Sequence, residues 1–287
     1  MESEIIKTTL FKTGFHRKVE LIELSDGYCY VRKTFPPDAI SDRDDEWNAL
    51  VYLYNEGYSV PKPIQKTDTG FSMQFIENGV FSALHKTTNN VINIDLEKKF
   101  SKLLFDLHSV KIFDKIECRN INFIQCEFTE IEHIIEKKHL DEYLKIFNKL
   151  KLESLHILNQ PLCYIHRDYH PWNVLLDKNE KLYTIDLTLK QGDYRFDVAW
   201  TYMILFRTSY AAKSDENAKF AERFLFEYAK FNPNVSVDFE FFKQLANLRW
   251  LVNVIKPEYR KHLETKEKDF FDLLVEAAEK SMVKYIG

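Results

Sequence analysis

The stretch CYIHRDYHPWNVLLD, from Cys163 to Asp177, decides how the rest of the sequence is interpreted. It combines two apolar runs, LCYI and NVLL, with two histidines, two aspartates, an arginine and an asparagine. A connection between neighbouring strands needs only about two to five turn residues. This connection is longer, and its polar residues are of the types that move protons and hold metal ions. The stretch therefore predicts a functional loop between two short strands.

A second carboxylate belongs to the same region. Asp186 ends the segment KLYTI, which we expect to pair with NVLL as a hairpin. That pairing brings Asp186 to the end of the hairpin that carries Asp168 and Asn173. Oxygen ligands without cysteine suit Mg²⁺ rather than zinc, and Mg²⁺ typically takes only one or two protein ligands beside phosphate oxygens. Asn173 and Asp186 fit that role, which leaves Asp168 to orient and deprotonate a hydroxyl.

A metal ion beside phosphates and a carboxylate for a hydroxyl are the requirements of phosphoryl transfer. This reaction also needs a cation on the nucleotide phosphates. Lys33 lies in the strand-like segment YVRKTF, and Glu46 follows 13 residues later in a predicted helix. A strand lysine held by a helix carboxylate is the pairing that kinases use to position phosphates. Taken alone, Lys33 is more simply a solvated strand residue and Asp186 a turn former. Only the combination of these residues favours the catalytic interpretation.

The overall composition excludes several classes of protein. The chain has 287 residues, of which 45% are hydrophobic and 29% charged, as in ordinary globular proteins. Its formal net charge of -4 provides no basic field for nucleic acid. No apolar run of about 18 residues predicts a membrane span. Because the start MESEIIKTTLFK lacks a signal-peptide core, we expect a cytoplasmic protein. We expect it to be a monomer or a homodimer.

The cysteines agree with that location. No CxxC pair is present, so we expect reduced thiols rather than disulfides or a zinc site. The four residues are Cys29, Cys118, Cys126 and Cys163.

The first part of the sequence predicts a small β-rich lobe. The segments KVELIEL and YCYVRKTF flank SDG, which is a favourable hairpin turn. An acidic start, an apolar face and Gly57 as terminator define one helix between residues 41 and 57. Residues 71–77 form another strand, and Gly14 separates two β-like segments upstream. We therefore predict that residues 1–78 form an N-terminal nucleotide-binding lobe with an antiparallel sheet and one helix.

The remainder predicts mostly helices. Thr129 and Glu132 have the spacing of a capping box, which predicts a helix start at that point. A further helix is expected over residues 140–158, and three or four more from Asp197 to the end. One helical face is apolar at Leu96, Phe100, Leu103, Leu104 and Leu107. Residues 79–287 are thus predicted to form a larger, mostly helical C-terminal lobe for catalysis and acceptor binding, in an α+β protein.

The segments HRDYHPWN and TIDLTLKQGDYRFDVAW resemble the aminoglycoside phosphotransferase and choline kinase family. That family has an H-x-D-x-x-x-x-N loop, an apolar strand that ends in aspartate, and a G-D-x-x-x-D pattern at a helix start. The segments EWNALVYLYNEGYSVPKP and FDLHSVK are also similar, so the resemblance spans most of residues 33–200. It implies a two-lobed protein kinase-like fold. The matching positions are His166, Asp168, Asn173, Asp186, Gly192, Asp193 and Asp197.

The resemblance implies a role for each residue of the proposed site. Asp168 would be the catalytic base, and Asn173 and Asp186 the Mg²⁺ ligands. Lys33 would contact the α and β phosphates of ATP or GTP, with Glu46 holding it in place.

Other roles follow from the same resemblance. The strand SMQFIE would lead into the hinge that meets the adenine edge, through backbone groups at Gln74, Phe75 and Ile76. His166 would orient the loop by hydrogen bonds. Asp197 is interpreted as a helix N-cap and structural acceptor rather than a catalyst, and Asp193 fits either role.

Some positions differ from the family pattern. Arg167 stands where the small-molecule kinases usually have glycine, whereas protein kinases favour H-R-D. Against a protein kinase, the metal-site segment reads IDL rather than DFG, and no A-P-E follows. His170 replaces a lysine two residues after the loop aspartate, and the G-x-G-x-x-G loop is missing.

Three functions therefore remain open: a kinase of a small hydroxylated molecule, a protein kinase-like enzyme, and a catalytically silent nucleotide-binding scaffold. An aminoglycoside acceptor would need an acidic pocket, a choline-like amine would need an aromatic cage, and a sugar is the third class. Carboxylates for such a pocket are offered by Glu216, Glu222, Glu227, Asp238, Glu240 and Glu258, with lysines between them. Aromatic residues for a cage are offered by Trp200, Tyr202, Tyr210 and Trp250.

Overall fold

The computed structural model describes residues 4–11, 17–81, 93–112, 123–158, 160–187, 189–254 and 265–286. The chain forms two compact units, each built from two segments. The first unit contains Met1–Leu96 and Pro171–Leu189, and the second contains Glu97–His170 and Lys190–Gly287. Three residues considered above lie outside the described residues, namely Gly14, Cys118 and Glu258.

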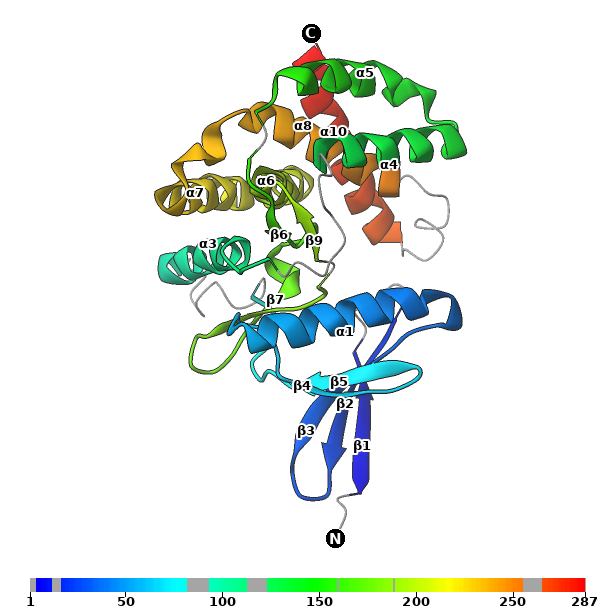
Figure 1. The fold of residues 1–287 in the computed structure, drawn as a ribbon, viewed down its shortest axis with the longest axis vertical. Helices are drawn as coiled ribbons and strands as arrows, with labels where there is room; N and C mark the ends of the chain where they lie inside the picture. The colour runs from blue at the N-terminus through cyan, green and yellow to red at the C-terminus, as the bar shows by residue number, and fades with distance from the viewer. Residues whose placement is uncertain are drawn as a thin grey trace. The chain divides into compact units, whose positions relative to one another are not determined.

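The first unit is built on a five-stranded sheet in the order β1-β2-β3-β5-β4 (Figure 1). All neighbouring strands of this sheet are antiparallel. The strands are β1 (Ile5–Leu10), β2 (Lys18–Leu24), β3 (Cys29–Thr34), β4 (Pro63–Lys66) and β5 (Gly70–Gln74). The sheet has the antiparallel character that the sequence predicts for this region.

The β2–β3 hairpin turns at Gly27, whose φ of 83° is a conformation that glycine adopts without a steric penalty. The helix α1 (Ile40–Asn55) ends before Gly57, whose φ of 77° has the same requirement. Both turn residues are therefore placed as the sequence predicts.

A short hairpin from far along the chain completes the first unit. Its strands, β7 (Val174–Leu176) and β8 (Leu182–Thr184), are antiparallel. Tyr58 and Ser59 follow α1 and hold this hairpin: the Tyr58 hydroxyl lies 2.8 Å from Thr184 Oγ1, and Ser59 Oγ donates to the Leu182 carbonyl at 2.5 Å. Residues separated by more than 120 positions thus belong to one unit.

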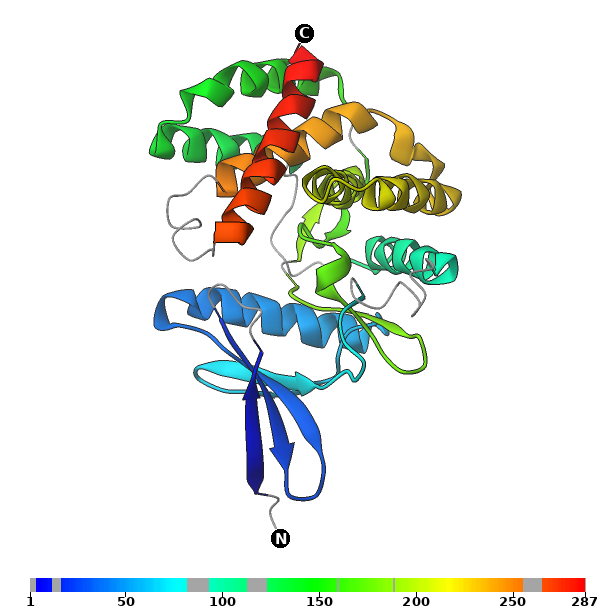
Figure 2. The same ribbon diagram turned by 180° about the vertical axis from the view of Figure 1, so that it is seen from behind.

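The second unit is mostly helical. The helix α6 lies at its centre and packs against α7, α8 and α10, as Figure 2 shows for α10. Two short antiparallel strands, β6 (Cys163–Ile165) and β9 (Lys190–Gly192), lead into the polar loop and into α6. The helices are α3 (Ile94–His108), α4 (Phe123–Lys138), α5 (Leu144–Glu153), α6 (Tyr194–Ala211), α7 (Glu216–Phe231), α8 (Phe239–Val254) and α10 (Thr265–Ile286). None of the helices in the described ranges is both long and apolar enough to cross a membrane.

The predicted apolar face of α3 is confirmed, because all five of its residues from Leu96 to Leu107 are buried. The predicted helix start at Thr129 is wrong. α4 begins at Phe123, and Thr129 lies in its interior, where its hydroxyl donates to the Gln125 carbonyl at 3.0 Å. The apolar repeat of Phe123, Phe128 and Ile131 continues through Thr129, so burial outweighs the local capping signal.

Candidate active site

Lys33 is the last residue but one of β3, and it pairs with Val19 of β2 on one side and with Phe71 of β5 on the other. Its side chain is buried, and Nζ donates to Glu46 Oε1 at 2.6 Å. Nζ also forms an ion pair with Asp186 Oδ1. The interpretation of Lys33 as a solvated strand residue is therefore wrong, and the predicted contact with Glu46 is present.

The strand around Lys33 depends on a glycine in β5. A Cβ atom on Gly70 would lie 2.0 Å from the Lys33 carbonyl oxygen, which no side chain can tolerate. Gly70 therefore permits the close approach of β5 to β3 at the lysine.

Glu46 is held by two cations. Besides Lys33, Arg17 Nη1 donates to Glu46 Oε2 at 2.8 Å. Burial raises the pKa of Glu46 above its ordinary value, while the two neighbouring cations act to lower it. Arg17 also lies over the ring of Phe35, 4.8 Å from its centroid. Arg17 was not singled out from the sequence, because no spacing rule connects an arginine before β2 to a helix 29 residues away.

Asn173 and Asp186 lie at one end of the β7–β8 hairpin. The Ile185 amide donates to the Asn173 carbonyl at 3.0 Å, directly after the last strand pair, Val174 and Thr184. Asn173 is buried, whereas the Asp186 side chain is 47% exposed. Asp186 also has a φ of 55°, in the left-handed region that few non-glycine residues adopt. The hairpin therefore brings the two predicted metal ligands together and presents one carboxylate to solvent.

The predicted adenine-binding residues lie where β5 ends. Gln74 is the last residue of β5, so Phe75 and Ile76 continue beyond the sheet. Gln74 is paired to Lys62 by two hydrogen bonds, with its amide donating at 2.9 Å and its side-chain carbonyl accepting at 3.2 Å. Ile76 is buried. Their role in nucleotide binding stays a prediction.

In the second unit, the carboxylate of Asp197 accepts hydrogen bonds from the backbone of the polar loop. Its carboxylate accepts the His166 amide at 2.5 Å and the Arg167 amide at 2.7 Å, and it lies 3.3 Å from His108 Nε2. Asp197 is fully buried in the first turn of α6, and the N-cap of that helix is Asp193 instead. The interpretation of Asp197 as a structural acceptor agrees with these contacts, but its interpretation as an N-cap is wrong. The carboxylate binds the loop rather than capping the helix, because the two loop amides lie within hydrogen-bond distance of it.

Asp168 has Trp200, His170 and His166 as polar neighbours within the second unit. Trp200 Nε1 donates to its Oδ1 at 3.2 Å, and His170 Nε2 lies 3.4 Å from the same oxygen. The Asp168 amide donates to His166 Nδ1 at 3.3 Å, which is consistent with a loop-orienting role for His166. Burial acts to raise the pKa of Asp168, but His170, His166 and the Trp200 N–H outweigh it, so the pKa lies below its ordinary value. The carboxylate is thus held ionised, with 45% of the side chain exposed.

Arg167, the departure from the family pattern, has a φ of 65°. This is the left-handed region, where glycine is the natural residue. The guanidinium is held by two glutamates of α4, with Nη2 at 2.6 Å from Glu127 and 3.4 Å from Glu130. Arg249 of α8 contacts the same pair, 3.6 Å from Glu127 and 2.5 Å from Glu130. Side-chain anchoring therefore replaces the conformational freedom of glycine at this position.

Arg207 is a buried cation on the same helix as Trp200, and no sequence signal singled it out. It is 2% exposed, its Nη1 donates to Asn247 Oδ1 at 2.6 Å, and its guanidinium lies 4.3 Å from the Trp250 ring centroid. Burial lowers the pKa of Arg207 to about 9, and the charge of Asp168 acts to raise it. Its position within the apolar segment MILFRTSYA is nevertheless a signal of a buried cation, because an arginine is rarely buried unless it has a partner.

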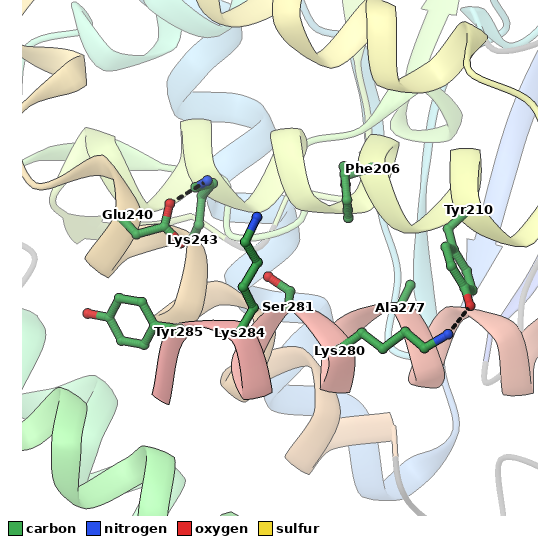
Figure 3. Close-up of a pocket in the computed structure, with 9 residues that line it drawn as sticks. All are labelled: Phe206, Tyr210, Glu240, Lys243, Ala277, Lys280, Ser281, Lys284 and Tyr285. Carbon is green, nitrogen blue, oxygen red and sulfur yellow. Dashed lines mark hydrogen bonds and ion pairs between the residues drawn. The ribbon is translucent and has the colours of Figure 1, made fainter. Parts of the chain in front are cut away.

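A separate cavity of about 560 Å³ lies among α6, α8 and α10 (Figure 3). Phe206 points into it from α6, while the amines of Lys243 and Lys280 are engaged by Glu240 and by the Tyr210 hydroxyl. It is lined by Phe206, Tyr210, Glu240, Lys243, Ala277, Lys280, Ser281, Lys284 and Tyr285.

The structure thus groups the predicted residues in two sets. Lys33, Glu46 and Asp186 are in direct contact in the first unit, with Asn173 at the same hairpin end. Asp168 belongs to the second unit, where Trp200 and the two histidines surround it. The first set offers a cation and oxygen ligands for a metal and phosphates, and the second offers an ionised carboxylate for a hydroxyl.

Known structures define the class of this fold. An ethanolamine kinase of Plasmodium vivax matches with a TM-score of 0.73 and 12% identity, covering 96% of this chain and 83% of that one. A choline kinase of Streptococcus pneumoniae matches with a TM-score of 0.68 and 18% identity, covering 98% and 95%. An ADP-bound aminoglycoside phosphotransferase, APH(2'')-Ib, matches with a TM-score of 0.62 and 19% identity, covering 96% and 94%. The fold is therefore that of the protein kinase-like small-molecule kinases, as predicted.

The model of the phosphotransferase enzyme family, APH, matches residues 7–234. The chain belongs to this family. A search of curated proteins found no significant match.

Proposed function

We propose that the protein transfers the γ-phosphoryl group of ATP or GTP to a hydroxyl group of a small molecule, and that it uses Mg²⁺. The observation that carries this proposal is the group of Lys33, Glu46 and Asp186, in which a buried lysine is held by a buried glutamate beside a half-exposed aspartate. Membership of the phosphotransferase family supports the same class of reaction.

The first unit supplies the nucleotide-binding residues in this proposal. Lys33 binds the α and β phosphates, because a buried ammonium that already has an exposed anionic partner can exchange that partner for a phosphate oxygen. Asn173 and Asp186 hold Mg²⁺, since an amide and a carboxylate oxygen at one hairpin end suit a hard cation. When bound, Mg²⁺ supplies charge neutralisation on the phosphate oxygens.

Adenine recognition falls to the segment after β5. Backbone groups near Gln74, Phe75 and Ile76 are assigned to the base, because the sheet ladder ends at Gln74. Gln74 itself is tied to Lys62, so its position is fixed by the sheet edge.

The second unit supplies the residue that acts on the acceptor. Asp168 accepts a hydrogen bond from the acceptor hydroxyl and takes its proton as the phosphoryl group arrives. Its lowered pKa keeps it ionised at neutral pH, and Trp200 holds one carboxylate oxygen in place. The other oxygen is directed by the loop that Asp197 and Arg167 fix.

The test is a transfer assay with purified protein, ATP or GTP, and a panel of amino sugars, choline-like amines, sugars, amino alcohols, hydroxy acids and protein substrates. We expect transfer to at least one small hydroxyl acceptor, loss of transfer in excess chelator, and strong impairment in Asp186→Ala. Transfer to proteins alone would favour the protein kinase-like enzyme. Nucleotide binding with no transfer to any acceptor would favour a silent scaffold.

A further inference from the structure

Arg207 is an unusual residue because, among the described residues, no acidic side chain forms an ion pair with its buried guanidinium. The guanidinium donates instead to the neutral Asn247. A buried charge is expensive unless it is paired. Its pKa of about 9 records that cost, yet it still leaves the side chain charged at neutral pH.

Asn247 adds an unused donor beside this cation. Its Oδ1 accepts from Arg207 Nη1 at 2.6 Å, which fixes the orientation of the amide group. Its Nδ2 is buried and has no hydrogen-bond partner, although the whole residue is 0% exposed. A buried amide donor without a partner is rare and calls for an explanation. Cation and donor together match the needs of a carboxylate or a similar anion.

The place of Arg207 on α6 connects it to the catalytic carboxylate. Trp200, which donates to Asp168, and Arg207 are seven residues apart, and therefore on the same face of α6 and about 10 Å apart along its axis. The charge of Asp168 also acts on Arg207.

The cationic acceptor classes have less support from the same elements. The four aromatic residues considered for a choline cage have separate partners, and the face of Trp250 is covered by the guanidinium of Arg207. Two of the described acidic residues considered for an aminoglycoside are engaged as well, Glu222 by Tyr202 and Asp238 by Arg195.

We propose that Arg207 and Asn247 bind an anionic group, most simply a carboxylate, on the acceptor, so that the substrate is a short hydroxy acid or hydroxy amino acid. Only the placement of the acceptor hydroxyl at Asp168 rests on the proposed function. The anionic end binds to Arg207 and Asn247 whether or not transfer follows. Arg207 is thus retained for specificity at a cost in stability.

The experiment uses acceptors in matched pairs that differ only in charge: glycerate with glyceramide, serine with serinamide, and 4-hydroxybutyrate with its amide. Binding is measured by calorimetry in the presence of Mg·ADP, and transfer is measured with Mg·ATP. The variants are Arg207→Met, which keeps the length and removes the charge, and Asn247→Leu. Arg223→Met is the matched control, since Arg223 is a half-buried arginine of the same unit, paired with Glu97 at 2.5 Å.

We expect the wild type to bind at least one acid about tenfold or more better than its amide, as one charge-assisted contact requires. Arg207→Met should abolish that preference, and Arg223→Met should keep it. The melting temperature gives a second readout: Arg207→Met should melt at or above the wild type, because an unpaired buried charge is removed, whereas Arg223→Met should melt lower.

Three results would overturn the inference. One is equal binding of every acid and its amide, or no binding of any acid. Another is loss of the preference in Lys284→Gln but not in Arg207→Met, which would place the anion in the cavity of Figure 3 instead. The third is a large fall in the melting temperature of Arg207→Met with an unchanged preference, which would make Arg207 structural. Acid binding that depends on Arg207 without any transfer would sustain the inference and refute the proposed function.

Discussion

Each unit of the molecule buries a glutamate between two cations. In the first unit, Glu46 lies between Lys33 at 2.6 Å and Arg17 at 2.8 Å. In the second, Glu127 lies between Arg167 at 2.6 Å and Arg249 at 3.6 Å. We call these the Lys33 group, which also includes Asp186, and the Arg167 group, which also includes Glu130.

The two groups differ in their second carboxylate. Asp186 is 47% exposed and pairs with Lys33. Glu130 contacts three cations, Arg167, Arg249 and Lys190. Lys33 can exchange the half-exposed Asp186 carboxylate for an oxygen of a ligand, whereas Glu130 is held by three cations at once. The Lys33 group is therefore suited to binding, and the Arg167 group to holding a strained loop.

The largest effect on the turnover number is expected at Asp168, which follows Arg167 in the loop. Asp168→Asn should lower the turnover number by about 10²- to 10⁴-fold, because a carboxamide cannot take the acceptor proton. The dissociation constant of the nucleotide should change little, since Asp168 acts on the acceptor. Steady-state kinetics and calorimetric nucleotide binding check both parts. Turnover equal to wild type would remove Asp168 from the mechanism.

The Lys33 group should give the next largest effect. Lys33→Ala should lower the turnover number by about 10²-fold or more, because the phosphates lose a preorganised cation. Glu46→Ala should cost less, since the lysine remains but is less well held. The double variant should lose less than the sum of the single losses, as expected for residues that act as a unit.

A double-mutant cycle on the transfer rate measures this coupling. Lys18→Ala is the control, because Lys18 lies on the same sheet, is 57% exposed and pairs with Glu20. Fully additive losses, or a Glu46 variant worse than the Lys33 variant, would show that the pair does not act together. The binding interpretation of the Lys33 group would then fail.

Substitutions in the Arg167 group should change the free energy of unfolding. Arg167→Ala removes the ion pair with buried Glu127 and keeps a left-handed residue, so we expect a loss of up to about 3 kcal/mol in the free energy of unfolding. Arg167→Gly removes the same guanidinium but relieves the backbone, and should be about 1 kcal/mol more stable than the alanine variant. Thermal or urea unfolding compares the two.

The same pair of variants tests the holding role. If side-chain anchoring sets the loop, both should lower the turnover number with little change in the KM for nucleotide, and glycine should not rescue activity fully. An alanine variant as stable as the glycine variant would mean that the left-handed backbone at Arg167 carries no cost.

The two groups were not equally visible in the sequence. Lys33 and Glu46 follow a strand-to-helix spacing, and Asn173 and Asp186 follow a hairpin register, so local patterns were enough to place them near each other. The division of the chain at residue 78 stays a prediction. The antiparallel sheet, the helix α1 and the helical remainder are predictable for the same reason, because periodicity and turn residues are local signals.

The Arg167 group depends on contacts between elements that no local pattern connects. Glu127 and Glu130 of α4 contact Arg167 of the loop over separations of 40 and 37 residues. Arg249 of α8 contacts Glu130 over 119 residues. Arg167 was noted only as a departure from a family pattern. Its left-handed backbone, which explains why glycine is common there, is a property of the folded loop.

The smallest effect is a pH dependence that separates the groups. Burial acts to raise the pKa of Glu130, but Arg249, Arg167 and Lys190 outweigh it and lower the pKa from 4.5 to about 2. A carboxylate with a depressed pKa in the folded state stabilises the protein above the unfolded pKa, and loses that contribution as the pH falls from 4.5 toward 2. Wild type should therefore melt higher than Glu130→Gln at pH 7, and this difference should shrink below pH 4.5.

Glu132→Gln is the control on the same helix, because Glu132 forms a half-exposed pair with Lys151, and surface pairs contribute little. A difference between wild type and Glu130→Gln that stays constant from pH 7 to pH 3 would show that Glu130 acts by packing rather than by charge, and the Arg167 group would lose its contrast with the Lys33 group.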